Sequence, residues 1–312
     1  MRIASIALGA SVLAACSGPL TLSQAALPQG GNATRAVAGD LLYAGIHHDI
    51  EVYAFPSGEY QETFQAKGNV SGMCSDASGN LFVTAAPGKS SPTGTGFIEE
   101  YAHGGKAPIA TLEVPKHEIP VACSSDPTTG NLAVTEENAS NFAPSVAIYA
   151  KAAGAPALYT SSALGADPQA GYDAGGDLLA TSGGDVAGEL LAGKTAFVTI
   201  TLSRTLGGVA HVQWDGKYFA LQSFDALRHN GEKIFERIYR IAISGTKGTV
   251  AGRTTFDDWS EKDAGQSWIQ GATIVATPLS EIVFWQYPTG GKPTKILHSH
   301  DRVKAVTVSV AQ

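Results

Sequence analysis

A short strand-like phrase recurs along this chain at a nearly constant interval, and this repeat limits the folds open to it. The phrase places an apolar residue three positions before an aromatic one. It occurs at residues 50–58, 98–102, 146–150 and 282–290. Its aromatic members Tyr53, Tyr101 and Tyr149 follow one another at intervals of 48 residues. A period of about 40–50 residues is typical of β-propeller blades, so we predict an all-β, six-bladed β-propeller.

Each repeat also contains turn residues that predict four short antiparallel strands per blade. Gly with Asn or Asp supplies the positive φ angles that a tight hairpin needs. Such turns occur at residues 76–80, 126–131, 173–177 and 214–217. Nothing suitable precedes the first turn, at Gly39 and Asp40, whereas residues 303–310 follow the last blade without a turn. We therefore predict that residues 303–310 form the innermost strand of blade 1 and close a single domain, residues 39–312. The boundaries of blades 4 and 6 stay open.

The phrase at residues 72–83 combines a turn aspartate, a Gly-Asn pair and an apolar strand. It resembles the NHL, SMP-30/gluconolactonase and TolB-like propellers, and the resemblance extends over most of residues 39–310. The resemblance implies a six-bladed fold. Enzymes of that group bind a divalent metal at the central channel through Glu, Asn, Asp or His, but the resemblance does not place those ligands on this chain.

The first residues have the pattern of an export signal. A positive start is followed by an apolar run, residues 3–12, which is too short to span a membrane. Leu13-Ala-Ala-Cys16 resembles the bacterial lipobox, which implies that residues 1–15 are removed and that Cys16 is lipidated. Residues 16–38 then form a flexible tether to the cell envelope, at the outer membrane or in the periplasm. An ordinary signal peptide with a chance cysteine is the alternative.

The charge balance argues against nucleic acid as a partner. The chain has 28 acidic and 21 basic residues, a net charge of −7, and such a surface repels phosphate backbones. Residues 188–195 match the phosphate-loop pattern, but the following β-branched run, residues 195–202, occupies the expected third strand of blade 4. We predict a loop there and no nucleotide partner.

Two cysteines remain after Cys16. Cys74 and Cys123 precede equivalent turns, so they are expected on the inner strands of neighbouring blades. An oxidising compartment permits a disulfide, whereas neighbouring inner strands often hold Cα atoms too far apart for one. We therefore favour two buried, unpaired thiols, and a disulfide is the alternative.

Histidines and aspartates are expected to meet on one rim of the ring. The loop between the second and third strands of a blade shares a face with the loop that joins two blades. In blade 1 these loops carry the candidate metal ligands His47, His48, Asp49, His298, His300 and Asp301. Imidazole and carboxylate groups are suitable ligands for a divalent metal such as Zn, Cu or Ca. Ordinary surface histidines are the alternative.

The same rim is expected to carry the other long loops. Their candidate binding residues are Glu136, Glu137, Asn138, Asp225, Arg228, His229, Trp259 and Trp268. Solvated loop charges are the alternative reading. No nucleophile, base and acid stand in a recognisable catalytic order. We therefore predict a lipid-anchored envelope binding or scaffold propeller that engages a protein, peptide or glycan through its loop-rich face. The alternative is a metal-dependent hydrolase or lyase of the SMP-30 or NHL type.

Overall fold

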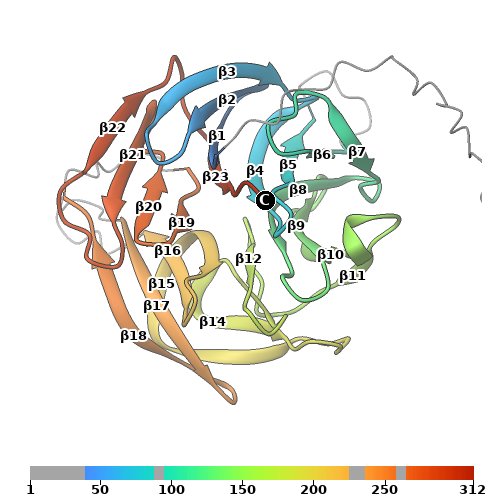
Figure 1. Ribbon diagram of the computed structural model, residues 1–312. Helices are drawn as coiled ribbons and strands as arrows, with labels where there is room; N and C mark the ends of the chain where they lie inside the picture. Colours follow the sequence, from blue (N-terminus) through green and yellow to red (C-terminus); the bar gives the residue numbers. More distant parts are fainter. Residues whose placement is uncertain (1–38, 88–94, 225–235, 258–264) are drawn as a thin grey trace, which may run out of the picture. The chain divides into compact units, whose positions relative to one another are not determined.

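The computed structural model describes residues 39–87, 95–224, 236–257 and 265–312. In these ranges the chain is built of β-strands with one short 3₁₀ turn, η1 (Ala150–Ala152). The strands form sheets that are arranged around a central axis as a ring (Figure 1). This confirms the predicted all-β propeller. A search of the described part for a helix of membrane-spanning length and apolarity finds none.

Blade 1 is completed by the C-terminal strand, as predicted. Its sheet has the order β23-β1-β2-β3. The bounds are β1 (Leu41–Ile46), β2 (Asp49–Ala54), β3 (Glu59–Gln65) and β23 (Ala305–Ser309). β23 pairs antiparallel with β1, from Leu41 opposite Ser309 to Gly45 opposite Ala305. The first and last strands of the ring therefore share one sheet.

Blades 2 and 3 are regular four-stranded sheets. Blade 2 consists of β4 (Asn69–Ser75), β5 (Leu81–Ala86), β6 (Phe97–Tyr101) and β7 (Pro108–Leu112). Blade 3 consists of β8 (Glu118–Ser125), β9 (Leu132–Asn138), β10 (Pro144–Tyr149) and β11 (Ala157–Tyr159). The predicted turns join the first two strands of each. In blade 2, Gly79 has a φ of 85° and the Asp76 carboxylate accepts the N–H groups of Ser78 and Asn80.

Blades 4 and 5 share one long strand, which explains why their boundary is indistinct in the sequence. A seven-stranded sheet has the order β12 to β18. Its bounds are β12 (Gln169–Tyr172), β13 (Leu178–Thr181), β14 (Gly183–Leu190), β15 (Val198–Trp214), β16 (Phe219–Phe224), β17 (Glu236–Ser244) and β18 (Lys247–Thr255). The first half of β15 pairs with β14 and its second half with β16. Dividing β15 there, we count six blades in the described residues.

The start of β15 corrects one expectation. Residues 195–202 were predicted to contain the third strand of blade 4, but the third strand is β14, and β15 is the fourth. Of the phosphate-loop-like residues, 188–190 end β14 and 191–195 lie in the turn between β14 and β15, in which the N–H of Lys194 bonds to the carbonyl of Leu191. The loop prediction is therefore correct for residues 191–195 and wrong for residues 188–190, and the strand that follows is the fourth of blade 4.

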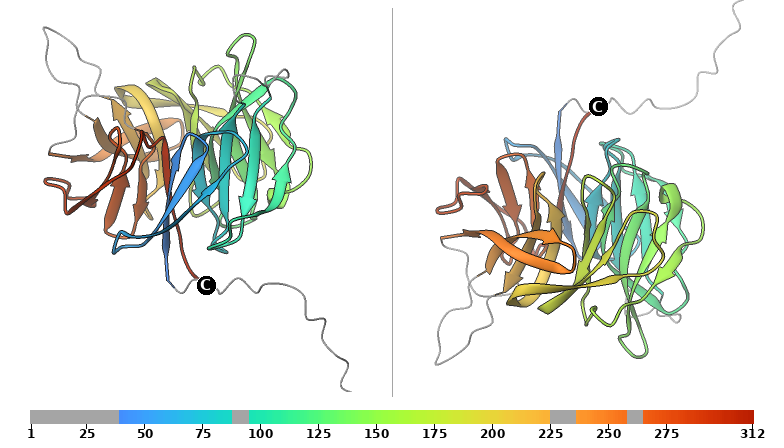
Figure 2. Two further views of the ribbon diagram at one scale, coloured as in Figure 1. Left: turned by 90° about the horizontal axis from the view of Figure 1, so that it is seen from above. Right: turned by 90° about the horizontal axis from the view of Figure 1, so that it is seen from below.

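Blade 6 follows with the order β19-β20-β21-β22. Its strands are β19 (Trp268–Gln270), β20 (Thr273–Ala276), β21 (Glu281–Gln286) and β22 (Lys295–His298). Edge-on views show the C-terminus on one face of the ring (Figure 2). We call this the C-terminal face; it also carries the turns at residues 76–80, 126–131 and 173–177. The opposite face, with the β1–β2 turn at His47 and His48, is called the rim face.

The recurring aromatic residues form the core between blades. Tyr101, Tyr149 and Trp285 are at most 1% exposed, because each lies at the same register of the third strand of its blade. Their repetition gives blades 2, 3 and 6 a large anchor against the next blade, whereas blades 4 and 5 have Leu190 and Ile241 at this register. The hydroxyl of Tyr101 donates to the buried carboxylate of Glu99 at 2.9 Å.

Cys74 and Cys123 form a disulfide, which corrects the favoured reading of two free thiols. Their Cα atoms are 5.7 Å apart, inside the range that a disulfide allows. The bond joins β4 to β8, the inner strands of blades 2 and 3. Thus the two strands approach more closely than was expected for neighbouring blades.

Candidate functional site

The two histidine loops of blade 1 do lie together on the rim face. His47 Nε2 is 3.4 Å from Asp301 Oδ2, and His300 Nε2 is 3.7 Å from Asp49 Oδ2. His300 Nδ1 also lies 2.8 Å from the buried carboxylate of Glu51, a partner that sequence reasoning missed. These contacts connect the segment before β23 with the β1–β2 turn and with β2, the third strand of blade 1.

The remaining candidate ligands are separate from this group. His298 lies 3.6 Å from Glu281, within blade 6, and His48 is exposed. In residues 39–87, 95–224, 236–257 and 265–312, no set of three or more His, Cys, Asp or Glu is arranged to hold a metal ion. His47, His298 and His300 therefore lie beside carboxylates in this structure, and the divalent metal stays a prediction.

The candidate binding residues do not form one surface. Glu137 and Asn138 are half-buried at the end of β9, where Glu137 accepts the N–H of Asp167 and Asn138 donates to Glu118. Trp268 was expected in a rim loop but lies on the inner strand β19 and lines the channel. Four other candidates, and the lipidation site, lie outside the described residues: Asp225, Arg228, His229, Trp259 and Cys16.

Glu136 is buried rather than exposed on the rim. It is 0% exposed, and neither carboxylate oxygen has a hydrogen-bond partner. Burial, and then the negative charge of Glu118, raise the pKa of Glu136 to about 8. The carboxyl group is therefore largely protonated at neutral pH, and it is unavailable to a ligand at the surface.

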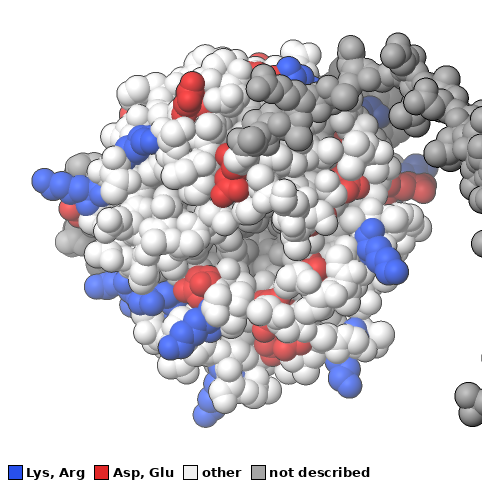
Figure 3. Space-filling model, in the orientation of Figure 1, with Lys and Arg blue, Asp and Glu red and all other residues white. Residues whose placement is uncertain are grey.

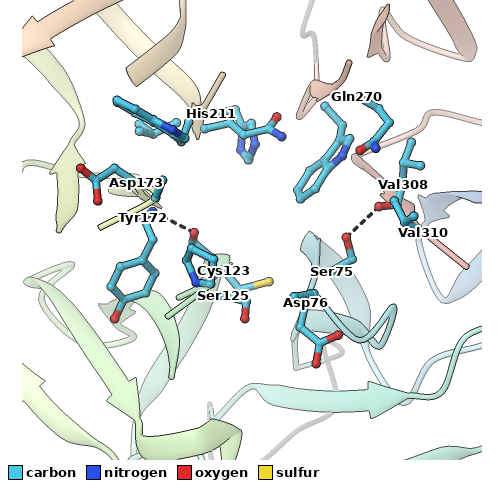
Figure 4. A pocket seen from close by; sticks show the side chains of 18 residues that line it. Ser75, Asp76, Cys123, Ser125, Tyr172, Asp173, His211, Gln270, Val308 and Val310 are labelled. Carbon is cyan, nitrogen blue, oxygen red and sulfur yellow. Dashed lines mark hydrogen bonds between the residues drawn. The ribbon is translucent and has the colours of Figure 1, made fainter. Parts of the chain in front are cut away.

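A cavity of about 360 Å³ opens at the centre of the C-terminal face. The inner strand of every blade contributes to its wall (Figure 4): Ser75, Cys123, Tyr172, Trp214, Trp268 and Val308. Its size is within the ~300–1,000 Å³ range of small-molecule sites. Figure 3 shows this face hollowed at its centre, with acidic side chains around the hollow and most Lys and Arg farther out.

Most polar groups of the cavity wall are engaged in holding the ring together. The carboxylate of Asp173 accepts the N–H groups of Gly175 and Asp177 within its own turn, as Asp76 does in blade 2. Both carboxylates are turned away from the centre of the cavity (Figure 4). The hydroxyl of Ser75 donates to Val308, so it ties blade 2 to blade 1. These groups are positioned for structure rather than for acid–base chemistry.

Amide side chains fasten blade 6 to blades 2 and 5 around the channel. Gln266, 5% exposed, accepts the N–H of Met73 at 3.0 Å and donates to the carbonyl of the same residue. Its side chain thereby bridges from the start of β19 to β4, past blade 1. Gln213 forms a similar pair of bonds with Ile269, at 2.8 and 2.7 Å. The inner strands around the cavity are thus held by side-chain bonds to backbone groups, which makes a rigid wall.

His211 occupies the centre of this wall. It is 3% exposed on β15, and burial lowers the pKa of its imidazole to about 3, so the ring is neutral at physiological pH. Its ring centroid is 6.1 Å from that of Trp268. Neither ring nitrogen has a hydrogen-bond partner, and the indole N–H groups of Trp214 and Trp268 also lack one.

Sequence reasoning missed His211, although the repeat contains a signal for it. The inner-strand residue opposite the fourth residue of the second strand is Gly72 in blade 2, Ala122 in blade 3 and His211 in blade 5. Two blades place a small residue where blade 5 places an imidazole. Aligning the strands before Asp76, Asp126 and Asp215 would have revealed this asymmetry.

Comparison with known proteins gives the fold. No family model matches the chain, and no curated protein matches it. Among solved structures, a chain of a nidogen/laminin complex has a TM-score of 0.64 at 12% identity, covering 88% of this chain and 100% of that chain. A protein of unknown function from Bacteroides caccae has a TM-score of 0.61 at 10% identity, covering 87% and 99%. The Cps50 (Swd1) β-propeller domain of Myceliophteria thermophila has a TM-score of 0.55 at 9% identity, covering 86% of each chain. Such similarity shows the fold alone, and that fold is a β-propeller.

Proposed function

We propose that this propeller is a non-catalytic binding module whose ligand enters the cavity on the C-terminal face. The observation that carries the proposal is a single cavity to which all six inner strands contribute. A ligand there contacts every blade, so its binding free energy comes from the whole ring rather than from one loop. The rigid wall also lowers the entropic cost of binding, because little has to become ordered.

The chemistry of the wall favours binding over hydrolysis. Three aromatic side chains, Tyr172, Trp214 and Trp268, provide flat apolar contact surface. The two carboxylates of the wall, Asp76 and Asp173, are bonded within their turns. A metal-dependent hydrolase would need several carboxylate or imidazole groups directed at one point. The cavity lies on the opposite face from the loop-rich rim that the sequence favoured. It is a better-defined binding site than the rim, whose candidate residues do not form one surface.

Blocking the cavity tests this function. Ala77 and Ala174 line the cavity as exposed turn residues, so Ala77→Trp or Ala174→Trp should fill its mouth without disturbing the core. Envelope material separated into glycan, peptide and protein fractions would be passed over the immobilised proteins. We expect the wild type to retain one fraction, and both variants to retain at least tenfold less of it.

The matched control is Ala107→Trp, which adds the same ring to an exposed turn of blade 2 away from the cavity. It should retain the fraction like the wild type. Equal retention by the Ala174→Trp variant would exclude the cavity as the binding site. Turnover of a sugar lactone by the wild type, lost on blocking, would replace binding with hydrolysis as the function.

The proposal includes anchoring at the cell envelope through Cys16. It is supported by the residues that precede the propeller, which have the pattern of an export signal and a lipobox. Cells that express the protein and grow with radiolabelled palmitate should incorporate label into the wild type but not into Cys16→Ser. Label in both proteins, or in neither, would contradict the anchor.

A further inference from the structure

Three side chains of the cavity wall carry N–H groups without a partner. They are His211, which is 3% exposed, and the indole groups of Trp214 and Trp268. All three line the same cavity, and the ring centroids of His211 and Trp268 are 6.1 Å apart. Figure 4 shows His211 in the cavity wall. Their positions on β15 and β19 bring them together from blades 5 and 6.

Such a concentration of unpartnered donors requires a physical explanation. A buried donor without an acceptor is destabilising, and folded proteins pair the large majority of such groups. In this cavity the ring nitrogens of His211 and the indole nitrogens of Trp214 and Trp268 have no hydrogen-bond partner. Several other polar side chains of the wall do form hydrogen bonds, among them Ser75, Ser124 and Gln213. The unpaired nitrogens of three side chains therefore meet at this one cavity.

We propose that the cavity binds a neutral carbohydrate, whose hydroxyl oxygens accept from His211, Trp214 and Trp268 while its ring lies against an indole face. This rests on the proposed function, because it names the ligand of the same cavity. A hydroxyl group both accepts and donates, so it can also satisfy the second, acceptor nitrogen of a neutral imidazole. The half-buried hydroxyl of Ser125 and the amide of Gln270 add further partners in the wall.

The charges around the cavity exclude the two charged alternatives. An anionic ligand would meet acidic side chains around the hollow (Figure 3). Asp173 lines the cavity itself, and it also lines a neighbouring pocket together with Asp177 and Glu189. A cationic ligand would meet N–H donors inside the cavity, because the carboxylates of Asp76 and Asp173 are bonded within their turns. A neutral, hydroxylated ligand has neither conflict.

The test uses the folded propeller, a panel of neutral mono- and oligosaccharides, and tryptophan fluorescence with calorimetry. His211→Phe keeps an aromatic ring against Trp268 and removes both nitrogens. Trp268→Phe keeps a ring and removes the indole N–H. We expect at least one saccharide to bind the wild type and to bind each variant about tenfold or more weakly.

A second measurement separates binding from folding. Because His211→Phe replaces an unpartnered polar ring by an apolar one, its melting temperature should be equal to or above that of the wild type. Trp285→Phe changes a tryptophan of the blade 6 core outside the cavity and should leave saccharide affinity unchanged. Unaltered saccharide affinity in His211→Phe would overturn the proposal. The proposal would also be overturned if the cavity retained a peptide or protein fraction and no saccharide. That result would leave the proposed binding function intact. If the Ala174→Trp variant retained the ligand as well as the wild type does, both the binding function and the carbohydrate proposal would be wrong.

Discussion

Deletion of residues 303–312 is expected to abolish cooperative folding of the propeller. β23 is the inner strand of blade 1, and all five of its residues are buried. It pairs with β1 on one side, while Ser75 and Gly79 of blade 2 bond to its other side. Removing it exposes the pairing edge of β1 and opens the core of two blades simultaneously.

The magnitude of this destabilisation approaches the stability of a whole domain. Val303, Val306 and Val308 are at most 1% exposed, and burying each is worth about 1.5–2 kcal/mol. The backbone bonds to β1, and the apolar surface of neighbouring residues that becomes exposed to water, add to that sum. Since a domain is stable by only ~5–15 kcal/mol, the shortened chain should be largely unfolded at 25 °C.

Circular dichroism and thermal unfolding of the shortened protein would measure this. A synthetic peptide of residues 302–312 added in trans should restore part of the sheet signal, which shows that the missing strand itself is responsible. For a full-length comparison, Val306→Asp should unfold the ring, whereas Ile296→Asp on β22, 45% exposed, should not. A shortened protein that melts like the intact one would mean that β23 does not close the ring.

The fold could be predicted because the same physical requirement recurs in each blade. The third strand must bury a large side chain against the next blade, so Tyr53, Tyr101 and Tyr149 appear at a fixed interval. The turns must adopt positive φ angles, so glycine recurs at positions such as Gly79 and Gly130. The closure of the ring by the C-terminal strand could be predicted because blade 1 lacks a first strand and one strand follows blade 6. The exception was β15, because a strand that serves two blades has no turn to mark the boundary.

The candidate site was less predictable, because it depends on departures from the repeat. Topology alone brought His47 and His300 to one face, and the structure places their loops in contact through Asp301 and Asp49. It could not show that Trp268 belongs to an inner strand, since β19 is only three residues long. Nor could it show that β4 and β8 approach closely enough for the disulfide, because that distance depends on three-dimensional packing.

Glu136 is the clearest departure, since the equivalent residue is Ile46 in blade 1 and Ala85 in blade 2. Blade 3 thus buries a carboxyl group where blades 1 and 2 bury a hydrocarbon. It shares one sheet face with Glu118 and Ser145, and their atoms Glu118 Oε2 and Ser145 Oγ also lack partners. Ionising Glu136 would place a second negative charge in this buried group, which is unfavourable at low dielectric constant.

The Glu136→Gln variant is therefore expected to be more stable than the wild type at neutral and alkaline pH. The pKa of Glu136 in the folded protein is raised from 4.5 to about 8, so the folded state retains a proton that the unfolded state loses. The stabilising contribution of the proton is complete below about pH 4.5 and disappears as the pH rises through about 8. Each pKa unit corresponds to about 1.4 kcal/mol, so the difference between variant and wild type should reach the order of 4 kcal/mol.

Urea and thermal unfolding of both proteins between pH 4.5 and pH 9 would measure this difference. The two stability curves should coincide at the acid end and separate as the pH rises, with the variant melting roughly 10 °C higher at pH 9. Glu59→Gln, on the exposed outer strand of blade 1, is the matched control and should follow the wild type throughout. Parallel curves for Glu136→Gln and the wild type would show that Glu136 is ionised in the folded protein. A partner such as a bound cation would then have to stabilise its charge, because an isolated carboxylate in this position is strongly unfavourable.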